Sequence, residues 1–249
     1  MRKLSSFFLL SFSLITTLFA TYEPPSCGYD SQDRATKVYY EAFDRAVEFV
    51  KMNQIEGDIV EFGTLEGFTA SIFAKLIAQY KMNSSLHLFD SFEGFPEITS
   101  KVDLNSYEVK DYKVWQSGGM ALNANIPELI KSKLQTIIPL ELVHIHKGYF
   151  SETFKEGTLQ SKPSIVHVDC DLYQSAKEVL SNLFKYDLVQ DGMIILFDDY
   201  NCGRANPKFG ERRALKEVMD ENPNFSHSLF FYYGWHGAAF IIHKEDKEG

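Results

Sequence analysis

Short, mostly apolar runs recur along the chain and alternate with longer segments whose apolar residues have helical spacing. These runs are four or five residues long and lie at residues 59–62, 86–89, 142–145, 165–168 and 193–197. Runs that stay apolar on both faces are typical of strands buried in a parallel sheet. The pattern therefore predicts five such strands.

The segments between and after these runs predict the remaining elements. Helical spacing is found at residues 34–52, 68–80, 127–136, 174–186 and 211–221. Two final apolar runs, at 228–233 and 238–243, are joined by a short turn and predict a hairpin. This order indicates one α/β domain over residues 34–249. We expect a doubly wound, mostly parallel seven-stranded sheet that ends in a C-terminal antiparallel hairpin.

Paired acids follow two of the predicted strands. Asp169 and Asp171 come after the run at 165–168, and Asp198 and Asp199 come after the run at 193–197. The carboxyl ends of parallel strands meet at one edge of a sheet, where ligands bind. Carboxylates gathered there repel one another unless a cation lies between them, and oxygen ligands favour Mg²⁺, Mn²⁺ or Ca²⁺. The alternative is that these acids are solvated loop residues or helix caps.

A glycine turn follows the first predicted strand, in the sequence Glu-Phe-Gly-Thr-Leu-Glu-Gly at residues 61–67. A nicotinamide-binding turn has a glycine where this chain has Leu65, so a pyrophosphate is disfavoured there. S-adenosylmethionine has an adenosine but no phosphate, and it tolerates the spacing of Glu61, Gly63 and Gly67. Asp90, at the end of the second strand, is placed to bind its ribose.

The segment from residue 99 to 119 is polar, spotted with aromatic residues and weakly periodic. A connection of this length is typically a functional lid or is disordered. If this chain binds a small molecule, we expect the segment to set its specificity, although nothing in it identifies a ligand. His144, His146 and His167 lie on or beside predicted strands and are expected to be core or supporting groups rather than ligands.

Composition excludes some functions. The chain has 249 residues and a net charge of −9, which argues against non-specific binding to nucleic acid because that requires a basic surface. Its three cysteines form no metal-binding or disulfide pattern, and its seven histidines have no metal-ligand spacing.

The first twenty residues resemble a secretory signal, with Arg2 and Lys3 before an apolar stretch and Ala20 at the expected cleavage point. Residues 21–33 are predicted to be an irregular lead-in. Any contact with a membrane is expected through this leader alone. An exported domain conflicts with a cofactor made inside cells, so the compartment stays open.

Five motifs together resemble the macrocin O-methyltransferase family. They are EFGTLEGFTA from residue 61, LFDSFEGFPE from 88, KGYFSET from 147, VDCDLYQS from 168 and FDDYN from 197. The resemblance covers about residues 39–243 and implies a Rossmann-like class I methyltransferase that uses S-adenosylmethionine and a divalent metal such as Mg²⁺. It implies a cofactor site at Glu61, Gly63, Gly67 and Asp90, with Ser91 and Phe92 nearby, and a metal site at Asp169, Asp198 and Asp199. The motif also contains Asp171, which we rank behind Asp169 as a ligand.

The implied reaction is methylation of a hydroxyl group on a small molecule, such as a sugar or another vicinal diol. A sugar hydroxyl is a poor nucleophile, so metal coordination and a neighbouring base would both assist it. We assign the base to Asp169 as a hypothesis. Two alternatives stay open: an exported binding protein without catalysis on the same fold, and a metal-dependent hydrolase. The first helix has an apolar face that would also suit a homo-oligomer.

Overall fold

The computed structural model describes residues 31–245. Residues Lys37–Gly249 form one compact unit, and of the preceding unit, Met1–Thr36, only the start of helix α1 is described. The predicted leader and most of the lead-in therefore lie outside the described residues. Helix α1 runs over Ser31–Met52, so the last three residues of the predicted irregular lead-in are helical. Those three residues are polar, and the apolar pattern that predicts the helix does not extend to them.

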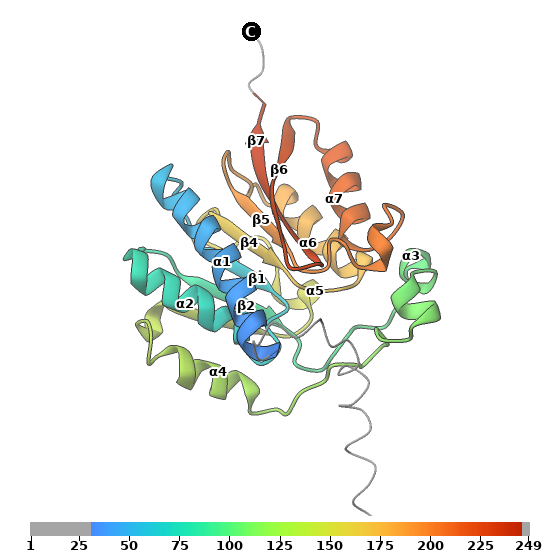
Figure 1. Ribbon diagram of the computed structural model, residues 1–249, viewed down its shortest axis with the longest axis horizontal. Helices are drawn as coiled ribbons and strands as arrows, with labels where there is room; N and C mark the ends of the chain where they lie inside the picture. Colours follow the sequence, from blue (N-terminus) through green and yellow to red (C-terminus); the bar gives the residue numbers. More distant parts are fainter. Residues whose placement is uncertain (1–30, 246–249) are drawn as a thin grey trace, which may run out of the picture. The chain divides into compact units, whose positions relative to one another are not determined.

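The seven predicted strands form one sheet in the order β3-β2-β1-β4-β5-β7-β6 (Figure 1). Strands β1 to β5 pair in parallel, whereas β7 is antiparallel to both β5 and β6. The predicted mostly parallel sheet with a C-terminal hairpin is confirmed. The strand bounds are Ile59–Phe62 (β1), Leu86–Asp90 (β2), Val143–Lys147 (β3), Ile165–Val168 (β4), Ile194–Phe197 (β5), Phe225–Tyr233 (β6) and Gly237–Lys244 (β7).

Helices cover both faces of the sheet, as a doubly wound fold requires. Helices α1, α2 (Phe68–Tyr80) and α4 (Ile126–Leu134) share one apolar core with the sheet, represented by Phe43, Phe73 and Leu134. The helices of the other face are α5 (Phe150–Thr153), α6 (Tyr173–Lys185) and α7 (Gly210–Glu221). They enclose a second core with residues such as Leu180 and Leu215. The parallel strands are thus buried on both sides, and their carboxyl ends share one edge.

The largest difference from the predicted strand bounds is in β6, which begins at Phe225 instead of residue 228. Ser226 and His227 interrupt the apolar pattern, yet both pair with β7. A register shift between Leu229 and Phe231 also breaks the alternation along this strand. Backbone pairing, which leaves no mark on side-chain polarity, extends the strand beyond its apolar part.

The segment from residue 99 to 119 is folded into short elements. Helix α3 spans Lys101–Leu104, and a π-helix, η1, spans Tyr107–Asp111. Serine side chains cap both elements, Ser100 at α3 and Ser106 at η1. The polar, weakly periodic pattern of this segment had predicted no helix, because capping and tertiary contacts hold these turns instead of an apolar stripe.

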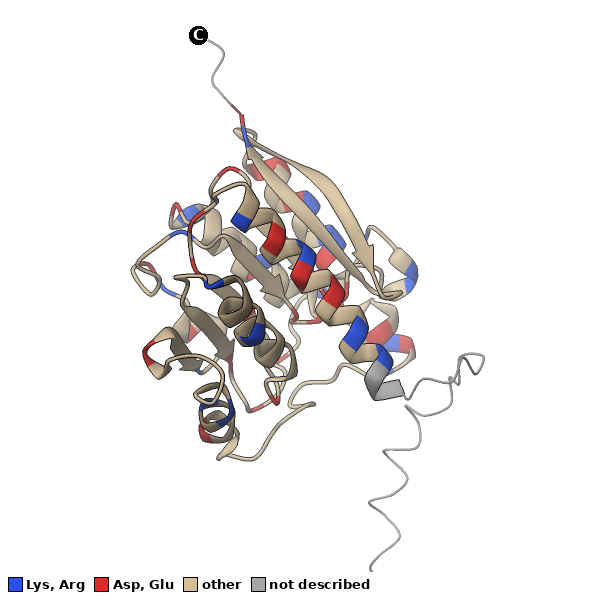
Figure 2. Cartoon of the chain, turned by 60° about the vertical axis from the view of Figure 1, so that its left-hand side comes forward, with Lys and Arg blue, Asp and Glu red and all other residues tan. Residues whose placement is uncertain are grey.

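Charged residues of both signs are spread over the helices, whereas strands β6 and β7 are almost free of them (Figure 2). Within residues 31–245, no helix has both the length and the apolar character needed to cross a bilayer.

Candidate functional site

A cavity of about 770 Å³ opens at the carboxyl edge of the parallel strands. Each of these five strands supplies at least one residue to its wall from the connection that follows it. Examples in strand order from β1 to β5 are Gly63, Ser91, Tyr149, Asp171 and Asp198. The position is the one at which open α/β sheets bind their ligands.

The glycine turn packs directly against the strand end that carries the first acid pair. Gly63 has φ = 90°, and a Cβ atom added to it would lie 1.6 Å from the carbonyl oxygen of Asp169. Only glycine has both the conformational freedom and the space for this approach. The turn and Asp169 are therefore brought together by backbone packing.

Asp90 connects this turn to the end of β2. One of its carboxylate oxygens accepts hydrogen bonds from the backbone N–H groups of Thr64 and Leu65, each at 2.8 Å. The other accepts from the backbone N–H of Phe92 at 2.7 Å. Oδ1, which accepts only the bond from Phe92, has a further lone pair, so Asp90 can still accept a hydrogen bond from a ligand. Its side chain shapes the turn as well as the wall of the cavity.

The structure divides the six residues predicted to bind a cofactor. Gly63, Asp90 and Ser91 line the cavity, whereas Glu61, Gly67 and Phe92 are absent from its wall. Gly67 precedes α2 with φ = 74° and packs against the side chain of Ile130. Phe92 is buried in the core beneath α1, α2 and α4.

Glu61 is fully buried and contacts a neighbouring strand. His167 Nδ1 lies 3.0 Å from Glu61 Oε1, and the two residues are direct partners in the register of β1 and β4. The ring of His167 packs against Phe43, with centroids 5.0 Å apart. His167 is thus the supporting core residue that the sequence pattern predicts.

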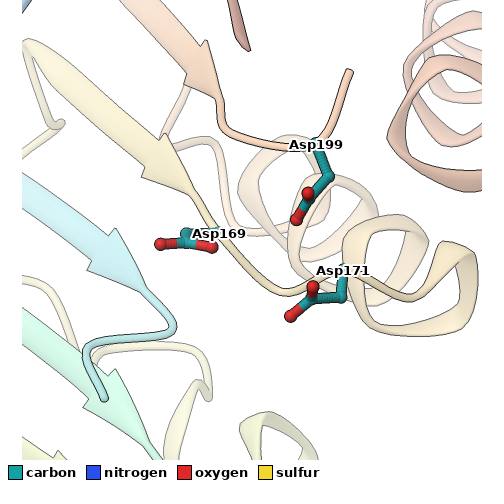
Figure 3. Close-up of side chains that lie close together, drawn as sticks. All are labelled: Asp169, Asp171 and Asp199. Atoms are coloured by element: carbon teal, nitrogen blue, oxygen red, sulfur yellow. The ribbon is translucent and has the colours of Figure 1, made fainter. Parts of the chain in front are cut away.

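Three carboxylates converge at the ends of β4 and β5. One oxygen each from Asp169, Asp171 and Asp199 lies within 4.8 Å of the other two, and Figure 3 shows the three side chains close together. Asp171 reaches this position from a left-handed backbone conformation, with φ = 59°. The predicted metal set contains Asp198 in place of Asp171, so the observed trio differs from it by one residue.

Asp198 lines the same cavity but has other partners. Its Oδ2 accepts a hydrogen bond of 2.9 Å from the hydroxyl of Tyr39 on α1. His236, from the turn between β6 and β7, donates from Nδ1 to the backbone oxygen of Asp198 at 2.7 Å, and this nitrogen lies 3.5 Å from Asp198 Oδ1. Burial alone would lower the pKa of His236, but the hydrogen bond and charge of Asp198 raise it to about 9. The protein itself thus supplies a cation to Asp198.

No basic side chain among residues 31–245 forms an ion pair with Asp169, Asp171 or Asp199. Burial, together with repulsion from Asp198 and Asp199, raises the pKa of Asp169 well above its usual range. Burial and the charge of Asp199 do the same to the pKa of Asp171. Burial and the charge of Asp198 raise the pKa of Asp199 to about 6, although a hydrogen bond from the thiol of Cys202 opposes the shift. Positive charge from outside the protein would therefore favour the ionised form of all three carboxylates.

A further buried acid, Glu211, lies behind the trio and was not predicted as a site residue. Its Oε2 accepts a hydrogen bond of 2.9 Å from the backbone N–H of Asp199, while its Oε1 has no hydrogen-bond partner among the described residues. Burial and the charge of Asp199 raise the pKa of Glu211 well above its usual value. Its sequence position, as the second residue of α7, resembles that of an ordinary acid in the first turn of a helix.

The donor set fits a hard divalent cation. All three converging groups are carboxylates, which are the ligands that Mg²⁺, Mn²⁺ and Ca²⁺ prefer. Binding such an ion would also relieve the repulsion that raises their pKa values.

Two side chains fix the part of the cavity wall that Glu97, Thr99 and Ser100 form. Asp103 accepts hydrogen bonds from the backbone N–H groups of Tyr173 and Gln174, at 2.7 and 3.0 Å, and so caps α6 from a distant part of the chain. Gln174 Oε1 accepts from the backbone N–H groups of Thr99 and Ser100, both at 3.1 Å. The segment predicted to form a lid is therefore tied to the first turn of α6.

The sequence matches a family model described as macrocin O-methyltransferase (TylF) over residues 35–226. Two curated relatives are O-methyltransferases of Streptomyces. The demethyldecarbamoylnovobiocin O-methyltransferase of Streptomyces niveus is 24% identical over 179 residues, which are 71% of this chain and 66% of that protein. The 8-demethyl-8-(2,3-dimethoxy-alpha-L-rhamnosyl)-tetracenomycin-C 4'-O-methyltransferase of Streptomyces olivaceus is 26% identical over 177 residues, which are 70% of this chain and 64% of that protein. The chain thus spans slightly less than two thirds of the length of either relative.

The fold is also found among solved structures. The crystal structure of CalS11, a calicheamicin methyltransferase, superimposes with a TM-score of 0.68. The match covers 84% of this chain and 80% of that one at 23% sequence identity, so it is a likeness of fold.

Proposed function

Because the chain belongs to the macrocin O-methyltransferase family, we propose that it is an S-adenosylmethionine-dependent O-methyltransferase that requires a divalent cation. The acceptor is a hydroxyl group of a small molecule, of the sugar type named for its relatives. The observation that carries this proposal is the glycine bend packed against the acid trio within one cavity.

The cavity suits the cofactor in size and charge. S-adenosylmethionine carries a sulfonium, an ammonium and a carboxylate group, so its net charge is positive, and several carboxylates line the cavity. The bend at Gly63 packs against the backbone of Asp169, which keeps the bend and the first acid together at one wall of the cavity. Asp90 would accept a hydrogen bond from a ribose hydroxyl with the remaining lone pair of Oδ1. Glu61 does not line the cavity, and it would support the position of β1 through its contact with His167 on β4.

Asp169, Asp171 and Asp199 would hold the divalent cation. This set keeps two of the three predicted ligands and replaces Asp198, whose carboxylate is engaged by Tyr39 and His236. A divalent cation supplies a field that lowers the pKa of a neighbouring hydroxyl group and orients vicinal diols.

Methyl transfer needs a base and an aligned nucleophile. The acceptor O–H would give its proton to a carboxylate oxygen of Asp169, the residue that touches the glycine bend. The freed oxygen forms a bond to the methyl carbon as the carbon–sulfur bond breaks, which leaves S-adenosylhomocysteine. With the divalent cation bound, the Asp169 carboxylate would be ionised and therefore able to take up this proton. Asp198, fixed by Tyr39 and His236, would hold the backbone between β5 and Asp199 in place.

Calorimetry and a methyl-transfer assay test the proposal. The full chain should bind S-adenosylmethionine without an acceptor, and Asp169→Asn should abolish turnover while changing cofactor affinity little. Glu141→Asn, an exposed change outside the cavity, is the control. Absence of cofactor binding would favour a metal-dependent hydrolase or a non-catalytic binding protein. Full activity of Asp169→Asn would remove Asp169 as the base.

A further inference from the structure

The charge of the cavity wall limits which acceptors can bind. Seven of the residues that line it are Asp or Glu, and none of the described lining residues is Lys, Arg or His. Some of these negative charges would be offset once a divalent cation and S-adenosylmethionine are bound.

Five of the seven have partners or an assigned role. Asp169, Asp171 and Asp199 form the trio, whose charge a divalent cation and the net positive charge of S-adenosylmethionine would offset. Asp198 is paired with His236. Asp90 accepts hydrogen bonds from three backbone N–H groups.

Glu97 and Glu178 are left without compensation. Neither carboxylate makes a hydrogen bond or an ion pair with the described residues, and both line the cavity. Burial raises the pKa of Glu178, and the more distant charge of Lys155 offsets this shift only in part. Glu178 is half-buried, so it would gain from a positively charged or hydrogen-bond-donating ligand. Glu97 is exposed, so it adds attraction for a cation without a desolvation cost of its own.

The positions of Glu97 and Glu178 are fixed by α6. Gln174 Nε2 donates to the backbone oxygen of Glu97 at 2.9 Å, and Gln174 lies one turn before Glu178 on the same helix. Gln174 and Ser175 line the cavity beside Glu178. The two free carboxylates thus belong to one preformed polar wall that also offers amide and hydroxyl groups to a polyhydroxylated ligand.

From this charge balance we infer that the acceptor is a polyhydroxylated molecule that carries an amine, such as an amino sugar, and that Glu97 and Glu178 bind its ammonium group. This inference rests on the proposed function, because it concerns the acceptor of the same site. Phosphorylated acceptors, nucleoside diphosphate sugars included, would place two further negative charges in a cavity whose described lining residues include no basic side chain.

The test measures binding to the full chain by calorimetry at near-physiological salt, with Mg²⁺ and sinefungin present. Sinefungin is an unreactive analogue that keeps a positive charge in place of the sulfonium. The probes are kanamycin A, a cationic amino-sugar compound, and thymidine diphosphate glucose. We expect kanamycin A to bind at least about tenfold more tightly, since like charges oppose the anionic probe.

A pair of double variants separates a site effect from the general acidity of the protein. Glu97→Gln with Glu178→Gln should weaken kanamycin A at least about tenfold while retaining sinefungin binding. Glu141→Gln with Glu156→Gln makes the same change in net charge at exposed positions outside the cavity, and it should leave the affinity within about twofold.

The outcomes separate the two proposals. If sinefungin does not bind, the proposed function itself fails. If sinefungin binds but kanamycin A binds less than about tenfold more tightly than thymidine diphosphate glucose, or neither probe binds, the inference about the acceptor is overturned and the methyltransferase proposal stands. Equal losses in the two double variants would also overturn it, because the effect would then come from overall charge.

Discussion

The contact between the glycine bend and Asp169 makes Gly63→Ala the most informative single substitution. At φ = 90°, an alanine is in a conformation that L-residues rarely adopt, which costs about 1–2 kcal/mol. Its Cβ would also lie 1.6 Å from the carbonyl oxygen of Asp169. Relieving that overlap requires a shift of at least about 1.4 Å in one of two packed backbone segments, and such overpacking costs about a further 1–3 kcal/mol.

Gly157→Ala provides the matched control. Gly157 has a similar φ of 83°, yet an added Cβ would meet nothing within 4 Å. Gly157→Ala should therefore lose only the free energy that the left-handed backbone conformation costs an alanine, about 1–2 kcal/mol. The difference between the two variants measures the close approach of the bend to Asp169.

Urea unfolding monitored by circular dichroism gives both free energies. We expect Gly63→Ala to lose about 2–5 kcal/mol in all, and its methyl-transfer rate to fall by about a hundredfold as Asp169 moves by about 1 Å. The rate of Gly157→Ala should be unchanged. If the two variants unfold at the same urea concentration, the bend does not press on Asp169 and this reasoning fails.

Three further predictions concern the acids. Asp171→Asn should weaken Mg²⁺ binding at least about tenfold in calorimetry, and more than Asp198→Asn does, because only Asp171 belongs to the trio; the reverse order would restore Asp198 as the ligand. Without metal, stability should fall as the pH rises from about 4 to about 6, since a carboxyl group whose folded pKa is raised, as that of Asp199 is, binds its proton more tightly in the folded state. Saturating Mg²⁺ should flatten this slope in thermal unfolding, and an unchanged slope would place the ion elsewhere. Asp103→Ala should cost about 1–2 kcal/mol by uncapping α6, and it should speed hydrogen exchange at residues 97–105 but not in α4; slow exchange at 97–105 would show that other contacts hold the wall.

The group of aspartates at the carboxyl ends of β4 and β5 could be predicted because it depends on the local pattern of apolar and acidic residues. The run that becomes β5 is apolar throughout, the run that becomes β4 is apolar except for His167, and both stop at aspartates. The ends of parallel strands must meet. Glu211 and Asp103 could not be found in this way. Their partners, Asp199 and the start of α6, are 12 and about 70 residues away in sequence, and each acid looks like an ordinary surface residue of a helix.

The directions in which side chains point could not be predicted from the sequence either. Asp198 and Asp199 are adjacent, and nothing local indicates which of them turns toward the trio. The choice is made by Tyr39 on α1 and His236 in the last hairpin, which engage Asp198. Likewise, Glu61 has the position of a cofactor ligand in its motif, but its strand neighbour His167 holds it in the core.

The strand order has a consequence for how the protein is made. Strand β6 is at the edge of the sheet and pairs with β7, which is synthesised after it. A nascent chain on the ribosome can thus assemble the five parallel strands while β6 still lacks its neighbour. His236 precedes β7, so the cationic partner of Asp198 emerges among the last residues of the domain. Until His236 has been synthesised, ions of the surrounding solution would have to offset the negative charge of the aspartates at this edge of the sheet.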